Sequence, residues 1–201
     1  VRAVEILVEA RVGRDQRGLE GLDGAREVLE GHGLVLAREG LFEDALKELE
    51  AAAGLAPDDP VVAYELGAAL ALKGEWEKAL DALMRSVDLD PAEGWGQVVL
   101  GLVEVELDRM EEASRDLSEG ARLRPEDAEA QFLAALAAKA AGWEDLAYEM
   151  LERGRQGARE WDLALLEEVE KRVYGENGPE GAEAIQELLP GALRERLMTR
   201  P

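Results

Sequence analysis

The sequence predicts an all-α protein, a single elongated α-solenoid of antiparallel helical hairpins. Prolines recur at a spacing of 34 residues, at Pro57, Pro91 and Pro125. Small residues keep the same period in two further series, which are Gly33, Gly67, Gly101 and Ala135, and Ala45, Ala79, Ala113 and Ala147. Hydrophobic residues make up 47% of the chain but aromatic residues only 4%, which favours close-packed Ala- and Leu-rich helices over a β-sandwich. A fixed period of this length indicates stacked helical hairpins.

Residues 1–25 precede the periodic region. Val1, Val4 and Val8 follow one another at helical spacing and predict a short amphipathic helix. The glycine-rich, charged stretch 13–24 predicts a loop. We expect this N-terminal helix and loop either to cap the first repeat or to dock into the groove of its own or another copy.

Four repeats follow, at residues 26–59, 60–93, 94–127 and 128–159. In each repeat a first helix should end at a tight turn, and a second helix should run on to the next repeat. The turn positions are Gly40, Gly74, Asp108 and Gly142. Asp58 and Asp59 can cap the first helix of the second repeat, with Pro60 tolerated in its first turn.

Residues 160–201 predict a degenerate fifth repeat with C-terminal capping helices. Trp161–Tyr174 has a helical apolar stripe, and the Gly- and Pro-containing stretch 175–179 predicts a turn. Further short helices are expected at Ala182–Leu189 and at Ala192–Met198, separated by Pro190. Loss of the pattern is typical of terminal repeats.

The periodic positions resemble those of the tetratricopeptide repeat. In the second repeat they are Leu66, Gly67, Gly74, Trp76, Ala79 and Pro91. The resemblance covers 26–159, with departures at His32 (usually Leu), Glu104 (usually aromatic) and Arg159 (usually Pro). It implies a right-handed superhelix whose first helices line a concave groove.

The same resemblance implies which side chains face that groove. They are Leu34, Arg38, Val61, Tyr64, Ala68, Leu72, Trp95, Val98, Leu102, Phe132, Leu136 and Lys139. The middle of this set is apolar, with three aromatic side chains spread along it, which favours docking of a peptide or a helix. The clamp of Lys, Arg and Asn with which some family members grip chaperone tails is absent, so we predict against a chaperone-tail adaptor.

The charge of the chain narrows the class of partner. The formal net charge is −22, which disfavours nucleic acids and anionic membrane surfaces. We expect a protein or peptide segment that is partly apolar and basic, or a second copy of the chain. There is no cysteine and no long apolar run, so neither a disulfide nor direct membrane insertion is expected. We expect a cytoplasmic protein, and the start at Val1 leaves open a periplasmic or membrane-anchored protein whose leader was trimmed.

No residue pattern predicts catalysis, a metal or a cofactor. His32 is the only histidine and has no Cys or second His to join it, so we interpret it as structural. Adjacent carboxylates such as Glu111 and Glu112 point in different directions on a helix, which favours a solvated face. No serine has a neighbouring base in a strand–turn–helix setting.

These observations favour a non-enzymatic scaffold that binds a peptide or helix in a concave apolar groove. The alternative is a self-associating assembly protein whose groove accepts the N-terminal helix, or another element, of a neighbouring copy. An enzyme or a small-molecule sensor is the third and weakest hypothesis.

Overall fold

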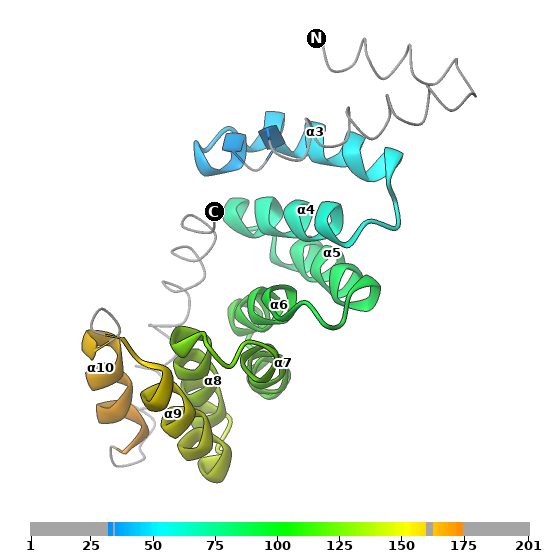
Figure 1. Ribbon diagram of the computed structural model, residues 1–201. Coiled ribbons are helices and arrows are strands. Elements are labelled where there is room, and N and C mark those ends of the chain that lie inside the picture. Colours follow the sequence, from blue (N-terminus) through cyan, green and yellow to red (C-terminus); the bar gives the residue numbers. More distant parts are fainter. Residues whose placement is uncertain (1–31, 34, 160–162, 175–201) are drawn as a thin grey trace, which may run out of the picture. The chain divides into compact units, whose positions relative to one another are not determined.

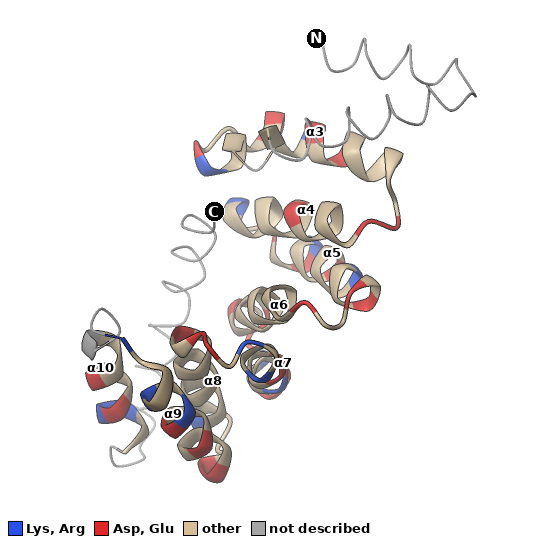
Figure 2. Ribbon diagram, in the orientation of Figure 1, with Lys and Arg blue, Asp and Glu red and all other residues tan. Residues whose placement is uncertain are grey.

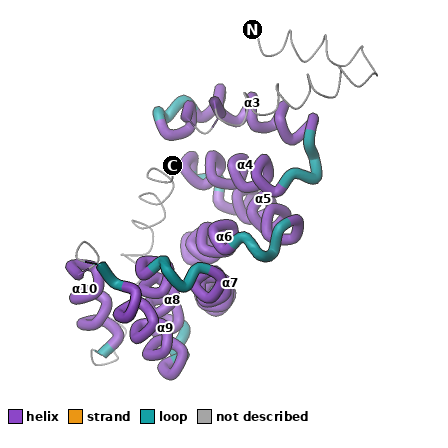
Figure 3. The backbone as a smooth tube through the Cα atoms, viewed as in Figure 1, coloured by secondary structure: helices purple, strands orange, loops and turns teal. Residues whose placement is uncertain are grey.

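The computed structural model describes residues 32–33, 35–159 and 163–174, without the side chains of 163, 164 and 168. These residues form helices and the loops between them, and none of them lies in a β-strand (Figure 3). The N-terminal helix and loop, the turn at 175–179 and the final helices predicted from the sequence lie outside the described residues.

The chain divides into two compact units, Val1–Leu89 and Asp90–Pro201. Stacked hairpins contact only their neighbours, so a solenoid can separate into compact groups at a boundary between repeats.

The N-terminal unit is built around α4. Its described helices include α3 (Phe42–Leu55), α4 (Pro60–Lys73) and α5 (Trp76–Leu89), and α4 packs against both of the other two (Figure 1). The predicted cap of α4 is confirmed, because an Asp59 Oδ1 accepts hydrogen bonds from the amides of Val61 and Val62 at 2.9 and 3.4 Å.

The C-terminal unit contains two complete hairpins and a further helix. They are α6 (Gly94–Glu106) with α7 (Met110–Leu123), α8 (Ala128–Ala140) with α9 (Glu144–Gly157), and α10 (Leu163–Val173). Helix α8 packs against α7, α9 and α10, which explains why every residue from Ala130 to Lys139 is buried. Figure 2 shows charged residues along much of α7, whereas α6 is largely uncharged.

In the first three repeats, a glycine of the first helix receives a leucine of the second. An added Cβ would lie 2.6 Å from Leu49 Cγ at Gly33, 2.6 Å from Leu83 Cγ at Gly67, and 2.7 Å from Leu117 Cγ at Gly101. The small-residue series therefore exists because a leucine fills the space where a side chain would stand. The described helices pack as antiparallel hairpins, which confirms the predicted all-α fold.

Among the described helices, none combines the length and the apolar character that crossing a lipid bilayer requires.

Candidate functional site

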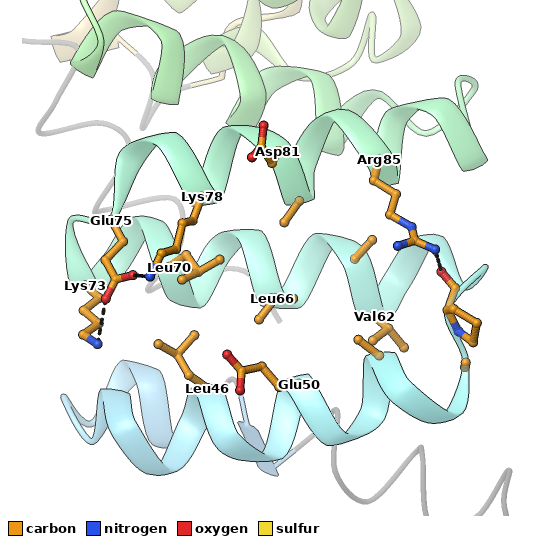
Figure 4. Close-up of a pocket in the computed structure, with 15 residues that line it drawn as sticks. Leu46, Glu50, Val62, Leu66, Leu70, Lys73, Glu75, Lys78, Asp81 and Arg85 are labelled. Carbon is orange, nitrogen blue, oxygen red and sulfur yellow. Dashed lines mark hydrogen bonds and ion pairs between the residues drawn. The ribbon is translucent and has the colours of Figure 1, made fainter.

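The N-terminal unit has an open cleft, with a volume of about 500 Å³, between α3, α4 and α5 (Figure 4). We call it the first cleft. Its apolar lining is formed by Leu46, Ala53, Ala56, Pro57, Val62, Ala63, Leu66, Leu70 and Ala82. Its charged lining is formed by Glu50, Lys73, Glu75, Lys78, Asp81 and Arg85.

Small side chains keep the first cleft open. Ala53 of α3, Ala63 of α4 and Ala82 of α5 stand on its three sides, where longer side chains would fill the space. The side of α4 that faces Leu83 of α5 is closed, because this leucine packs onto Gly67. The sequence thus leaves the hairpin tightly packed on one side of α4 and hollow on the other.

The cations around the first cleft are already paired. The Lys73 and Lys78 ammonium groups lie 2.8 and 2.6 Å from the carboxylate of Glu75. Hydrogen bonds from these two lysines lower the pKa of Glu75 to about 2, so it is ionised at any physiological pH. Arg85 donates from Nη2 to the carbonyl oxygen of Pro57 at 2.5 Å (Figure 4).

Two carboxylates of the first cleft are exposed and pair with no residue of the described chain. Glu50 of α3 and Asp81 of α5 lie on opposite sides of the cleft, with Leu66 of α4 between them (Figure 4). Within the part of the chain that the structure describes, neither carboxylate makes a hydrogen bond or an ion pair. Lys73 and Arg85 have further carboxylate neighbours, Glu43 at 3.6 Å and Asp58 at 3.5 Å, so Glu50 and Asp81 are the charged side chains of the lining that have no partner in the described chain.

A second cleft, of about 350 Å³, occupies the equivalent place in the C-terminal unit. It lies between α7, α8 and α9, and Ala121, Pro125, Gln131 and Arg153 line it. These four stand 68 residues, or two repeats, beyond Ala53, Pro57, Ala63 and Arg85 of the first cleft. Gln131 takes the place of an alanine and donates from Nε2 to the Ala121 carbonyl at 2.6 Å, which accounts for the smaller volume.

Most of the groove predicted from the sequence is not an open surface. Seven of its twelve side chains are buried: Tyr64, Ala68, Val98, Leu102, Phe132, Leu136 and Lys139. These seven side chains lie within the packing of first helices that are buried on more than one side. Phe132, for example, packs so closely on α9 that a Cβ at Gly154 would collide with its ring.

The other five predicted groove residues have mixed surroundings. Val61 of α4 is 52% exposed, whereas Arg38 and Leu72 are half-buried. Trp95 is also half-buried, and the guanidinium of Arg124 lies over its ring at 4.6 Å from the centroid. Leu34 lies outside the described residues. None of these five lines the first or the second cleft.

The sequence reasoning missed the residues that line the clefts. Its groove residues on α4 are Val61, Tyr64, Ala68 and Leu72, whereas the cleft uses Val62, Ala63, Leu66, Leu70 and Lys73. One signal was present, since Arg153 follows Pro125 at the same distance of 28 residues at which Arg85 follows Pro57.

The structure also brings together two acidic side chains away from either cleft. Glu104 of α6 is buried and hydrogen-bonds to Asp116 of α7. Burial, and then the charges of Asp116 and Glu112, raise the pKa of Glu104 to about 8. Burial also raises the pKa of Asp116. Two carboxyl groups cannot hold a metal alone, and no group of three metal-ligating side chains occurs among the described residues.

His32 is exposed, and its Nδ1 lies 2.7 Å from an oxygen of Glu48. This hydrogen bond joins the first helix of its repeat to α3.

No protein-family model matches the chain, and no curated protein matches it. Several solved structures, however, match the chain. A crystal structure of MamA is 23% identical with a TM-score of 0.61, covering 77% of this chain and 97% of that one. The MamA RS-1 ArsTM double mutant is 20% identical with a TM-score of 0.62, covering 87% and 97%. A mutant of the Thermobaculum terrenum O-GlcNAc transferase is 22% identical with a TM-score of 0.59, covering 67% of this chain and 26% of the enzyme. At these identities the similarities establish the fold, which is of the tetratricopeptide type.

Proposed function

We propose that the protein is a non-catalytic scaffold and that the first cleft binds a segment of a partner protein. One observation carries the proposal: an open cleft with an apolar floor, flanked by two exposed carboxylates that pair with none of the described residues. Apolar side chains inserted into such a cleft supply affinity, and charges on its rim select the partner.

The position of the cleft supports a protein ligand. The first cleft opens between consecutive second helices, and the same geometry returns two repeats later in the second cleft. A partner segment can lie along such a hollow and place alternate side chains in it, as in known modes of peptide recognition. No nucleophile–base pair lines either cleft, which agrees with a binding role.

The proposed site differs from the concave groove predicted from the sequence. Burial of Phe132, Leu136 and Leu102 removes the apolar surface on which that prediction depended. Val61 remains exposed on the predicted side of α4, so it provides a matched control for residues of the cleft.

Partner capture tests the proposal. The full chain is immobilised on a resin and incubated with native extract. The proteins that it retains are then identified by mass spectrometry. Ala82→Glu introduces a charged side chain on the floor of the cleft and should abolish capture, whereas Val61→Glu on the other side of α4 should leave it intact. Circular dichroism verifies that both variants fold. Loss of capture in Val61→Glu alone would refute the cleft as the binding site.

A further inference from the structure

One stretch of the chain has the charge and the apolar pattern that the first cleft requires. Residues 193–200 read Leu-Arg-Glu-Arg-Leu-Met-Thr-Arg, with three arginines and one glutamate, which gives a formal charge of +2 in a chain of net charge −22. This stretch lies outside the described residues.

The order of residues in this stretch gives it two basic edges. It overlaps the short helix predicted at Ala192–Met198. At about 100° per residue, Leu193 and Leu197 share one face of a helix, and Arg194 and Arg196 fall roughly 80° to either side of it. The segment thus presents leucines flanked by one arginine on each edge.

The first cleft has the complementary arrangement. Its floor carries Leu66, and Glu50 and Asp81 lie on the two sides of that floor (Figure 4). Both carboxylates are exposed and make no ion pair within the described chain, so a docking arginine displaces no existing partner. A volume of about 500 Å³ accommodates the leucine side chains, while the helix itself rests on the rim.

We propose that the first cleft binds residues 193–200 of a second copy of this chain. The leucines enter the apolar floor, and Arg194 and Arg196 pair with Glu50 and Asp81. The inference rests on the proposed function, because it uses the same cleft and names its occupant. Since the cleft and the segment are different surfaces, the contact is head-to-tail and extends into a ring or a filament.

Charge exchange between the two surfaces tests this pairing. The cleft variant carries Glu50→Lys and Asp81→Lys, and the segment variant carries Arg194→Glu and Arg196→Glu. The control variant carries Glu77→Lys and Asp88→Lys, the same charge change at exposed positions of α5 outside the cleft. Sedimentation velocity of full chains over a wide concentration range gives the mass of each species.

We expect the wild type and the control variant to associate as concentration rises. The cleft and segment variants should each associate at least about tenfold more weakly. Combining all four substitutions in one chain, or mixing the two variants, should restore association, which a simple loss of folding cannot produce. The association should weaken as salt rises.

Three results would overturn the inference. They are a wild type that stays monomeric at all concentrations, association that the cleft and segment variants leave unchanged, and no recovery when the reversed charges are combined. The wild type could instead stay monomeric and still capture another protein, with capture lost in Ala82→Glu. That result would overturn the second copy as occupant and leave the proposed function standing. Capture that is indifferent to Ala82→Glu would instead overturn the proposed function.

Discussion

Glu104 and Asp116 form a hydrogen bond between the two helices of the α6–α7 hairpin. Glu104 stands at a position that is usually aromatic in the repeat family, and it is 6% exposed. A buried and a half-buried carboxyl group in contact cannot both be ionised cheaply, so the pair retains one proton near neutral pH. At this position a protonated carboxyl group, and not an apolar contact, therefore joins the two helices of the hairpin.

The stability of the C-terminal unit should depend on pH through this pair. The pKa of Glu104 is about 8 in the folded chain, above its ordinary value of 4.5, so the folded state binds more protons between these two pH values. The free energy of unfolding should therefore fall as pH rises through this window, by about 2 kcal/mol between pH 6 and 8.5. Urea unfolding at several pH values measures this dependence.

Glu104→Gln is the matched control for this prediction. The glutamine can still donate a hydrogen bond to Asp116 but does not titrate, so the pH dependence should flatten. Equal slopes for the wild type and this variant would contradict the assignment to Glu104.

Substitution of two glycines should have opposite effects. A Cβ at Gly101 would lie 3.0 Å from the backbone nitrogen of Leu117 and 3.1 Å from the carbonyl oxygen of Ala113, so Gly101→Ala should destabilise by about 1–3 kcal/mol. Gly54 of α3 has no atom within 4 Å of an added Cβ, so Gly54→Ala should stabilise by about 0.5–1 kcal/mol. Thermal unfolding of the two variants measures both effects. A change in stability of the same sign in both variants would refute the close contact at Gly101.

The left-handed turn at Asp108 predicts a stabilising substitution. The equivalent turns use Gly40, Gly74 and Gly142 at φ values of 82°, 84° and 78°, whereas Asp108 adopts φ 58°. Asp108→Gly should remove the cost of a side chain in this region and stabilise by about 1 kcal/mol. Gly142→Ala should destabilise by a similar amount, although an added Cβ meets no atom within 4 Å there. Chemical denaturation of both variants distinguishes this backbone effect from packing.

Removing the charge of Lys139 should cost less stability than removing the charge of its partner, Glu144. Its ammonium lies 2.9 and 3.0 Å from the two carboxylate oxygens of Glu144, and its side chain is 5% exposed. Glu144→Gln leaves a buried cation without its countercharge and should cost about 1–3 kcal/mol, whereas Lys139→Met removes the charge and should cost less. Denaturant midpoints of the two variants give the order, and a larger loss for Lys139→Met would contradict it.

The fold could be predicted from the sequence because its rules are local and recur. The period of 34 residues marks the hairpins, and Asp59 with Pro60 marks the start of α4. The reason for the glycine series could not be read from the pattern, since its closest partners are leucines, such as Leu83 against Gly67. Asp108 kept the turn despite replacing glycine, because aspartate tolerates the left-handed region better than most residues.

The candidate site could not be predicted in the same way. Periodicity assigns a residue to a face of its helix, but it does not show what covers that face. Phe132 and Leu102 lie on the predicted face and are fully buried, whereas Val61 on the same face is exposed. The first cleft depends on three alanines from three helices, Ala53, Ala63 and Ala82, and only the packed structure brings them together.

Photo-crosslinking to the captured partner tests the central claim most directly. A photoreactive phenylalanine analogue is placed either at position 82, on the floor of the first cleft, or at position 61, on the other side of α4. Irradiation of the complex should produce a crosslinked partner from position 82 and none from position 61. Crosslinking from position 61 alone would contradict the claim that partners bind in the first cleft.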